Sequence, residues 1–261
     1  MLAAKPIAKP EAVLPILYQD EQLVAIHKPA GLLVHRSVLD RHETRFAVQL
    51  LRDQIGRRVQ PVHRLDKGTS GVLLFAFEKD VAATMSTQFE SLEVHKTYLA
   101  IVRGWPAEQG LIDHALPIVR DEYEAPAAAE SAAQPARTAW RRLATAELPL
   151  QVDRYPTSRY ALLALFPETG RRHQIRRHLK HVSHPIIGDA TYGKGRHNRM
   201  FAEHIGVGRL FLASSRLQCR HPVSGDALDI RAPLAPEFER VVEALGWRDA
   251  LAAFEREASA E

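Results

Sequence analysis

The sequence has 261 residues, of which 46% are hydrophobic and 25% are charged, a composition typical of one or two globular domains. Its single cysteine, Cys219, excludes an intrachain disulfide and a cysteine-based zinc site. The sequence shows neither a secretion signal nor an apolar run of about 20 residues, which predicts a soluble cytoplasmic protein without a membrane span. The net charge of +4 argues only weakly for a polyanionic partner.

The hydrophobic pattern predicts strands and helices in irregular alternation. Residues 1–12, rich in Ala, Lys and Pro, are expected to form a flexible tail. The expected strands are a pair around residues 19–21, the segments 71–77, 96–102 and 160–166, and a hairpin over 217–230. The expected helices are 46–55 and 81–92, with apolar residues at helical spacing, and 237–245. This order favours an α+β fold over a doubly wound sheet.

One internal segment is expected to lack a fixed structure. Residues 121–137 are rich in Ala, Glu and Pro and contain hardly any large apolar side chain, so they cannot bury enough surface to offset the cost of ordering the backbone. We therefore expect a flexible insertion there. Because neither side of it looks able to close a core alone, the expected organisation is a single domain over 13–248, followed by a C-terminal tail over 249–261.

A short acidic turn is the most informative segment of the chain. It reads His63-Arg64-Leu65-Asp66-Lys67-Gly68-Thr69-Ser70-Gly71. Asp66 stands between cations and precedes a glycine-bounded turn that enters an apolar strand. An aspartate in this position can be a turn residue that accepts hydrogen bonds from nearby backbone amides, or it can be a reactive carboxylate. Local chemistry alone leaves both interpretations open.

A second segment is strongly basic. It reads Thr169-Gly170-Arg171-Arg172-His173-Gln174-Ile175-Arg176-Arg177-His178. The cations between residues 171 and 180 are Arg171, Arg172, Arg176, Arg177 and Lys180, with no acidic residue among them. Such a ridge fits contact with phosphates, although a solvated basic helix is the commoner structure on charge alone.

Arg176 is expected to differ from the rest of this ridge. If Ile175, Leu179 and Val182 form the buried face of a helix, Arg176 lies beside that face and near the core. A half-buried arginine needs an anion. The cations four residues before and after it would instead meet solvent or phosphate.

A third segment, Lys96-Thr97-Tyr98-Leu99-Ala100, places a tyrosine on an expected strand. Its ring can point to either face of the sheet. Core tyrosines with one bonded hydroxyl are commoner than catalytic ones, so Tyr98 by itself decides nothing.

Together these segments resemble the RluA family of pseudouridine synthases, whose active site combines an H-R-L-D-x-x-T-S-G turn, a K-x-Y-x-A strand and a G-R-x-H-Q-I-R-x-H segment. All three occur here in that order, and segments 28–35 and 184–189 extend the resemblance from about residue 16 to 247. It implies the pseudouridine synthase fold, a mixed and mainly antiparallel bent sheet flanked by helices. The S4-type RNA-binding domain of some members is not expected, because the resemblance starts almost at the first residue of the sequence.

The resemblance also implies residue roles. Asp66 matches the nucleophile or essential carboxylate, Tyr98 the aromatic residue that stacks on the target base and can assist proton removal, and Arg176 the salt-bridge partner of the aspartate. Arg64 matches a residue that fills the gap left by a flipped uridine, a role suited to a planar cation. The other residues expected to contact RNA are His63, Arg171, Arg172, Arg177 and Lys180.

The expected reaction needs neither a cofactor nor a metal. Isomerisation breaks the bond from uracil N1 to C1′, turns the base and rejoins it through C5, and a carboxylate can attack C1′, attack the ring, or remove a sugar proton in a glycal route. The sequence does not choose among these three. The histidines near the basic segment, His173, His178, His181 and His184, lack the spacing and intervening Glu of zinc hydrolases, so a metal site is not expected.

Within the family, three stretches resemble a tRNA-directed subgroup that acts on uridine 65 in the T stem. These are 34–37 with 39–41, then 51–56, and 197–199 with 202–204. A tRNA substrate and a monomeric enzyme are therefore expected, and ribosomal RNA is the alternative target. A non-catalytic RNA-binding module would have no reason to keep Asp66, Tyr98 and Arg176 together, and a carboxylate-based hydrolase would need a second acid.

Overall fold

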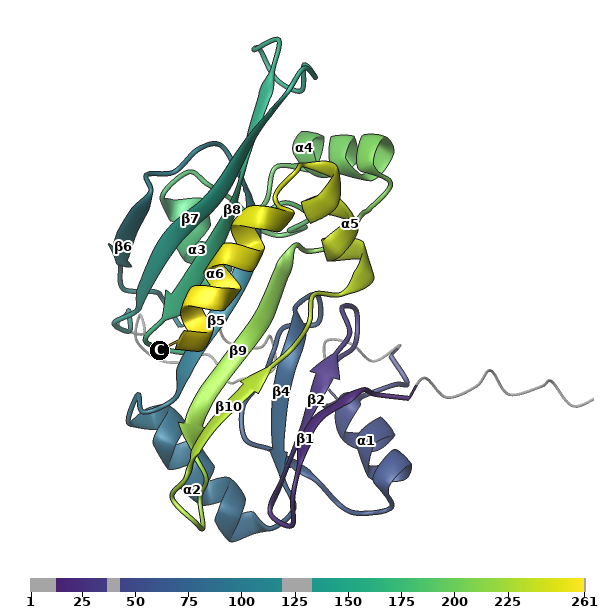
Figure 1. The fold of residues 1–261 in the computed structure, drawn as a ribbon, viewed down its shortest axis with the longest axis vertical. Coiled ribbons are helices and arrows are strands. Elements are labelled where there is room, and N and C mark those ends of the chain that lie inside the picture. The colour runs from purple at the N-terminus through teal and green to yellow at the C-terminus, as the bar shows by residue number, and fades with distance from the viewer. Residues whose placement is uncertain (1–12, 37–42, 119–132, 261) are drawn as a thin grey trace, which may run out of the picture.

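The computed structural model describes residues 13–36, 43–118 and 133–260 (Figure 1). Its strands are β1 (Ile16–Gln19), β2 (Leu23–Lys28), β3 (Gln60–Pro61), β4 (Ser70–Ala76), β5 (His95–Arg103), β6 (Gln109–Asp113), β7 (Arg137–Leu148), β8 (Ser158–Pro167), β9 (Leu212–Arg220) and β10 (Ala227–Arg231). Its helices are α1 (Ala47–Ile55), α2 (Lys79–Glu90), α3 (Gln174–His181), α4 (Gly195–Met200), the π-helix η1 (Phe201–Ile205), α5 (Pro236–Ala244) and α6 (Arg248–Ala260). The expected α+β class is confirmed.

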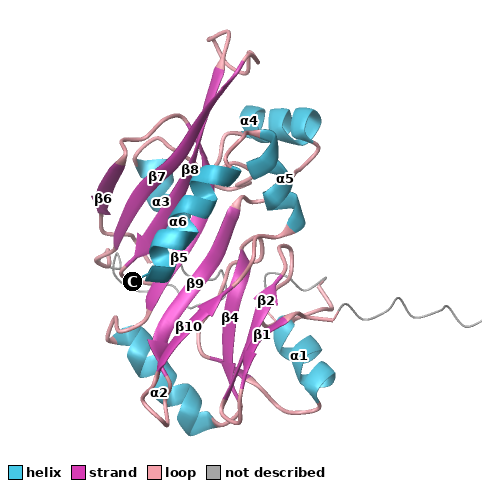
Figure 2. Cartoon of the chain, viewed as in Figure 1, coloured by secondary structure: helices cyan, strands magenta, loops and turns pink. Residues whose placement is uncertain are grey.

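The ten strands of the described residues form one mixed, mainly antiparallel sheet (Figure 2). Their order is β1-β2-β4-β9-β5-β8-β7-β6, with β3 beside β4 and β10 beside β9. Only β4 and β9 run parallel, and they pair through two residue pairs, Ser70 with Ala213 and Gly71 with Ser214. This short contact joins a half built on β2 and β4 to a half built on β5, β8 and β9.

Strand β4 is buried at every residue, because helices cover both of its faces. Its alternate side chains enter different clusters: Val72 shares one with Met85 of α2, and Leu73 shares another with Leu51 of α1. A strand covered on both faces needs a continuous apolar run rather than an alternating one. The continuous apolar run after the Asp66 turn therefore matches β4, a strand in the interior of the sheet.

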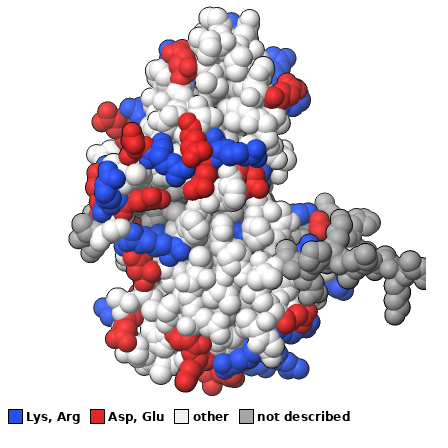
Figure 3. All heavy atoms as spheres, turned by 45° about the vertical axis from the view of Figure 1, so that its right-hand side comes forward, with Lys and Arg blue, Asp and Glu red and all other residues white. Residues whose placement is uncertain are grey.

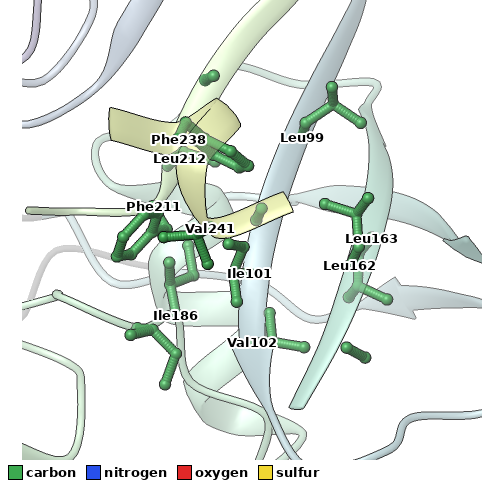
Figure 4. Packing of buried hydrophobic residues seen from close by; sticks show 14 of the residues in the cluster. Leu99, Ile101, Val102, Leu162, Leu163, Ile186, Phe211, Leu212, Phe238 and Val241 are labelled. Atoms are coloured by element: carbon green, nitrogen blue, oxygen red, sulfur yellow. The ribbon is translucent and has the colours of Figure 1, made fainter. Parts of the chain in front are cut away.

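The other half of the sheet is also covered on both sides. In Figure 1, α6 crosses in front of the sheet and α3 lies behind it. Figure 4 shows Phe238 and Val241 of α5 packed beside Phe211 and Ile101, and the rings of Phe211 and Phe238 lie 5.5 Å apart. Burying a side chain of this size contributes about 1.5–3 kcal/mol. This cluster fixes β5 and α3, which carry two of the expected site residues.

The C-terminal segment differs from the expectation of a tail. Residues 248–260 form helix α6, whose Leu251 and Phe254 are buried against the sheet. The segment is rich in Ala and Glu, and a helix of this length is marginal in isolation. It is ordered because two apolar side chains find a partner surface that the local sequence does not reveal.

The end of the expected insertion is ordered as well. Gln134 pairs with Leu116, and β7 begins at Arg137. Strand β7 was not expected, because most of its residues are only half-buried and several are charged, which weakens the apolar pattern of a strand. The remainder of the insertion, 121–132, and the expected tail 1–12 lie outside the described residues.

The close approach of β4 and β9 requires glycine at position 71. Gly71 has a φ of +109°, and a Cβ atom there would lie 2.0 Å from the carbonyl oxygen of Ser214. We expect Gly71→Ala to lower the free energy of unfolding by about 3 kcal/mol, measured by urea denaturation. Gly56→Ala is the matched control, since Gly56 also has a positive φ but open space around it, and should lose about 1 kcal/mol. Equal losses in the two variants would contradict the steric explanation.

Candidate active site

The turn that carries Asp66 is held from two directions. The Thr69 backbone N–H donates to the Asp66 carbonyl at 3.0 Å and closes the turn. The Lys67 carbonyl accepts from Gly31 N at 2.7 Å and from Lys28 Nζ at 3.2 Å. Lys28 is completely buried, which lowers its pKa to about 7, and its ammonium also donates to two carbonyls of the loop after β2. The loop after β2 and the Asp66 turn are therefore tied together.

Arg176 connects this turn to helix α3. Its Nη1 donates to Asp66 Oδ2 at 2.9 Å, which is the ion pair expected from the sequence. Its Nε and Nη2 donate to the two carboxylate oxygens of Asp189 at 2.7 and 2.9 Å. Two parallel bonds of this kind fix both the position and the orientation of a guanidinium. Asp189 therefore holds Arg176 so that one N–H group points at Asp66.

Asp189 is itself held rigidly as an anion. Burial by itself would raise the pKa of Asp189. Hydrogen bonds from Arg176 and from the backbone N–H groups of Tyr192 and Thr191 outweigh this effect, so the pKa of Asp189 lies below its usual value. The side chain of Asn198 in α4 forms two hydrogen bonds to the same segment: it accepts one from the Gly188 backbone N–H at 2.8 Å and donates one to the Asp189 carbonyl at 3.0 Å. The subgroup-like segment 197–199 thus supports the Arg176 partner.

His173 lies on the other side of Asp66. It precedes α3 with a φ of +54°, a conformation that only few non-glycine residues adopt. Its Nε2 is 3.7 Å from Asp66 Oδ1, too far for a hydrogen bond, and its Nδ1 is 3.1 Å from the Tyr192 hydroxyl. Burial lowers the pKa of His173 despite the attraction of Asp66, so at neutral pH the ring is a neutral hydrogen-bonding group rather than a cation.

Tyr98 reaches the site from strand β5. A bulge between Thr97 and Tyr98 interrupts the pairing with β9, and bulges next to active sites often re-aim a side chain. The ring lines a hollow together with Asp66 and Arg176. Burial and the charge of Asp66 raise the pKa of the Tyr98 hydroxyl to about 12, so it remains protonated at neutral pH.

Asp66 lies where two hollows meet. The larger has a volume of about 680 Å³ and the smaller, which contains Tyr98, about 320 Å³. The residues that line both are Arg64, Leu65, Asp66, Arg172, His173 and Arg176. Together the hollows have the size of a small-molecule or nucleotide site, and the Asp66 side chain is 21% exposed, so a ligand can reach its carboxylate.

Two polar residues of the basic segment have structural roles. The buried Gln174 side chain accepts from Thr169 Oγ1 at 2.7 Å and donates to the Arg137 carbonyl at 2.9 Å. His178 bonds to Thr138 Oγ1 through Nδ1 and to the His114 carbonyl through Nε2. These bonds fasten α3 to β7, which explains why polar residues stand on the buried side of such a short helix.

The expected RNA-contacting cations separate into two groups. Arg64 is exposed and lines both hollows at Asp66, where Arg172 also lies, and Arg171 lines the smaller one. Arg177 and Lys180 line a different hollow farther along α3. On the face drawn in Figure 3, Lys and Arg are interspersed with Asp and Glu, and a broad area carries neither, so positive charge does not gather there.

His63, which was expected to contact RNA, makes contacts within the fold. Its Nε2 accepts from the Leu74 backbone N–H at 3.0 Å, and its ring stacks on Phe89 at 4.9 Å. Burial lowers the pKa of His63 to about 3, so the ring is neutral and already has its partners. The sequence could not show this, because it does not reveal which partner takes a ring nitrogen.

Sequence reasoning missed Asp189, Lys28 and His173 as parts of the site. Lys28 and His173 have no pattern around them that marks them as part of the site. Asp189 has an indirect signal: Arg176 was expected to need an anion, and Asp189 is the next acidic residue along the chain, 13 positions later. The subgroup-like residues 39–41 lie outside the described residues.

Two classes of feature are missing from the described part of the chain. No group of three or more His, Cys, Asp or Glu side chains is placed there to hold a metal ion. None of the helices described is long and apolar enough to cross a membrane.

The chain is similar to known proteins over most of its length. The tRNA pseudouridine synthase C of Yersinia pestis is 49% identical over 239 residues, which cover 90% of this chain and 92% of that protein. That of Vibrio cholerae is 48% identical and covers 92% and 98%. The protein of the same name from Pectobacterium carotovorum is 50% identical over 93% of this chain, which spans 65% of its length.

Solved structures agree with this similarity. The human RNA pseudouridylate synthase domain containing 4 superposes with a TM-score of 0.65 at 27% identity, over 88% of this chain and 92% of that one. The human domain containing 1 has a TM-score of 0.66 at 24% identity and shares the fold. A family model described as RNA pseudouridylate synthase matches residues 22–181. The chain therefore belongs to the RNA pseudouridylate synthase family, as the resemblance implied, and is an isomerase.

Proposed function

We propose that this protein converts a uridine of tRNA to pseudouridine, at position 65 in the T stem, as a cytoplasmic monomer that uses no cofactor. The observation that carries the chemistry is the Asp66 carboxylate, held by Arg176 at the junction of two hollows, with Arg176 clamped by Asp189. The similarity of 48–50% to proteins named tRNA pseudouridine synthase C supports the choice of tRNA.

In this proposal Asp66 is the reactive group. Arg176 binds Oδ2 and leaves Oδ1 without so close a donor, which orients Oδ1 for reaction with the substrate. Asp189 fixes the orientation of Arg176, and Arg176 in turn fixes the position of the Asp66 carboxylate. A reactive group that is already in position does not have to be ordered when the substrate binds.

The isomerisation is balanced without an outside reagent. The bond between N1 and C1′ breaks, the uracil turns, a bond forms between C5 and C1′, and the C5 proton is lost while N1 gains one. Asp66 can attack C1′, attack the ring, or remove a sugar proton, and the geometry is compatible with all three routes. Tyr98, protonated at neutral pH, is suited to stack on the base and donate a hydrogen bond while the base turns.

A paired stem has to be opened before this chemistry can occur. Flipping a nucleotide out of a helix costs a few kcal/mol, which new contacts must return. Arg64 is suited to fill the vacated space, because it is exposed and lies beside Asp66. A-form RNA hides the base edges of its deep groove, so selection should rest on tRNA shape and on contacts to phosphates and 2′-hydroxyls.

The substrate is tested by mapping pseudouridines in a strain that lacks the gene. We expect loss of one pseudouridine, at position 65 of tRNA, and restoration of the same site when purified protein is added to unmodified transcripts. Folded tRNA should outcompete a short hairpin of the same stem, because shape contributes to binding. Loss confined to large-subunit ribosomal RNA would replace the tRNA target, and a strain with no lost site, together with an inactive purified protein, would favour a non-catalytic RNA-binding module.

A further inference from the structure

A third hollow lies along α3, apart from the two hollows that meet at Asp66. It has a volume of about 320 Å³ and is lined by His114, Arg177, Lys180, His181 and Tyr192, together with two apolar residues. Three of its members, Arg177, Lys180 and His181, belong to α3, and His114 directly follows β6. The hollow is therefore built from separate segments of the fold.

The lining of this hollow is suited to an anion. It includes an arginine, a lysine and two imidazoles but, among the described residues, no Asp or Glu. Neither Arg177 nor Lys180 forms an ion pair with a carboxylate in the described part of the chain. The rings of His114 and His181 stack face to face, with their centres 3.8 Å apart. An imidazole N–H can donate to a phosphate oxygen whether the ring is neutral or charged.

One residue connects this hollow to the active site. The Tyr192 ring lies close to two cations of α3: the guanidinium carbon of Arg176 is 5.1 Å from the ring centre, and Lys180 Nζ is 5.7 Å from it. The Tyr192 backbone N–H donates to Asp189, and its hydroxyl bonds to His173 beside Asp66. Tyr192 therefore contacts Lys180 of the hollow as well as Arg176 and His173 beside Asp66.

We propose that this hollow binds one backbone phosphate of the RNA substrate, close in sequence to the uridine that enters the cleft at Asp66. This inference rests on the proposed function and adds a second anchoring point to it. Arg177 and Lys180 supply the charge, His114 and His181 supply hydrogen-bond donors, and Tyr192, whose hydroxyl bonds to His173 beside Asp66, completes the polar lining. A phosphate held here fixes the position of the strand while the neighbouring nucleotide leaves the helix.

The proposal is tested by removing the two cations together. We expect Arg177→Gln/Lys180→Gln to raise KM for the tRNA transcript about tenfold with kcat changed less than about twofold, and to reduce the slope of log KM against log salt by about 1. The matched control is Arg58→Gln/Lys79→Gln, which removes the same charge from two exposed residues near α1 and α2. The control should change KM by less than about twofold.

A second measurement locates the phosphate. Transcripts in which one methylphosphonate replaces one phosphate at a time should show a position near the target where the wild-type enzyme binds about tenfold more weakly and the double variant is unaffected. If both enzymes respond equally at every position, or if the double variant matches the control in KM, the phosphate site is rejected. If the wild-type protein modifies no tRNA, the proposed function is rejected instead. The wild type and the double variant are then compared on the RNA that the wild type does modify, and that comparison decides the phosphate site.

Discussion

Asp66→Asn is expected to abolish pseudouridine formation, with kcat reduced at least about 10³-fold. The amide oxygen can still accept the hydrogen bond from Arg176, so the variant keeps the shape of the site but lacks the anion that reacts. Turnover is measured by release of tritium from C5 of labelled uridine in tRNA. RNA affinity, measured by filter binding, should remain within about threefold, because no cation is removed.

The control for this variant is Asp53→Asn, which removes a carboxylate from the exposed surface of α1. It should leave kcat and KM unchanged. Thermal denaturation of both variants checks that they are folded. Measurable turnover by folded Asp66→Asn would exclude Asp66 as the nucleophile or essential base.

Arg176→Met is expected to lose both activity and stability. The change leaves the buried Asp189 carboxylate with backbone donors but without its counterion, and breaking a buried pair in this way destabilises by about 3–5 kcal/mol. The carboxylate of Asp66 loses its held position at the same time, so kcat should fall at least about 100-fold. Urea denaturation and single-turnover kinetics measure the two effects separately.

The pH dependence of this stability loss follows from Asp189. Its pKa in the folded protein is lowered, so its contribution to the free energy of unfolding is present above the unfolded pKa of about 3.9 and is lost as pH falls through the folded pKa. The stability difference between wild type and Arg176→Met should therefore be largest near neutral pH and shrink below about pH 4. A difference that stays constant from neutral to acidic pH would contradict the role assigned to the ion pair.

A double variant distinguishes the structural role of the pair from its catalytic role. Arg176→Met/Asp189→Asn removes the buried charge that Arg176→Met leaves unpaired, so it should recover part of the lost stability. It should not recover kcat, because Asp66 still lacks its partner. Recovery of kcat together with stability would show that Arg176 acts only through the fold.

The sequence by itself determined the family and the core of the site. Asp66 and Arg176 are 110 residues apart, yet their motifs placed them together, and the structure brings them to 2.9 Å. The apolar run after Asp66 likewise predicted β4, because a strand buried on both faces leaves a continuous local signal. The strand could be predicted from a local pattern, whereas the pairing of Asp66 with Arg176 followed from the resemblance of two short motifs to a known family.

Only the tertiary structure decided which partners the remaining residues have. Asp189 carries no local sign that it clamps Arg176, and His63 carries none that its ring is taken by Leu74 and Phe89. The sequence of helix α6 predicts a tail, and the helix is ordered because its apolar side chains pack against the sheet. In each case the contacts that stabilise the residue or helix are with groups distant in sequence. A local sequence pattern does not predict where those groups will lie in the fold.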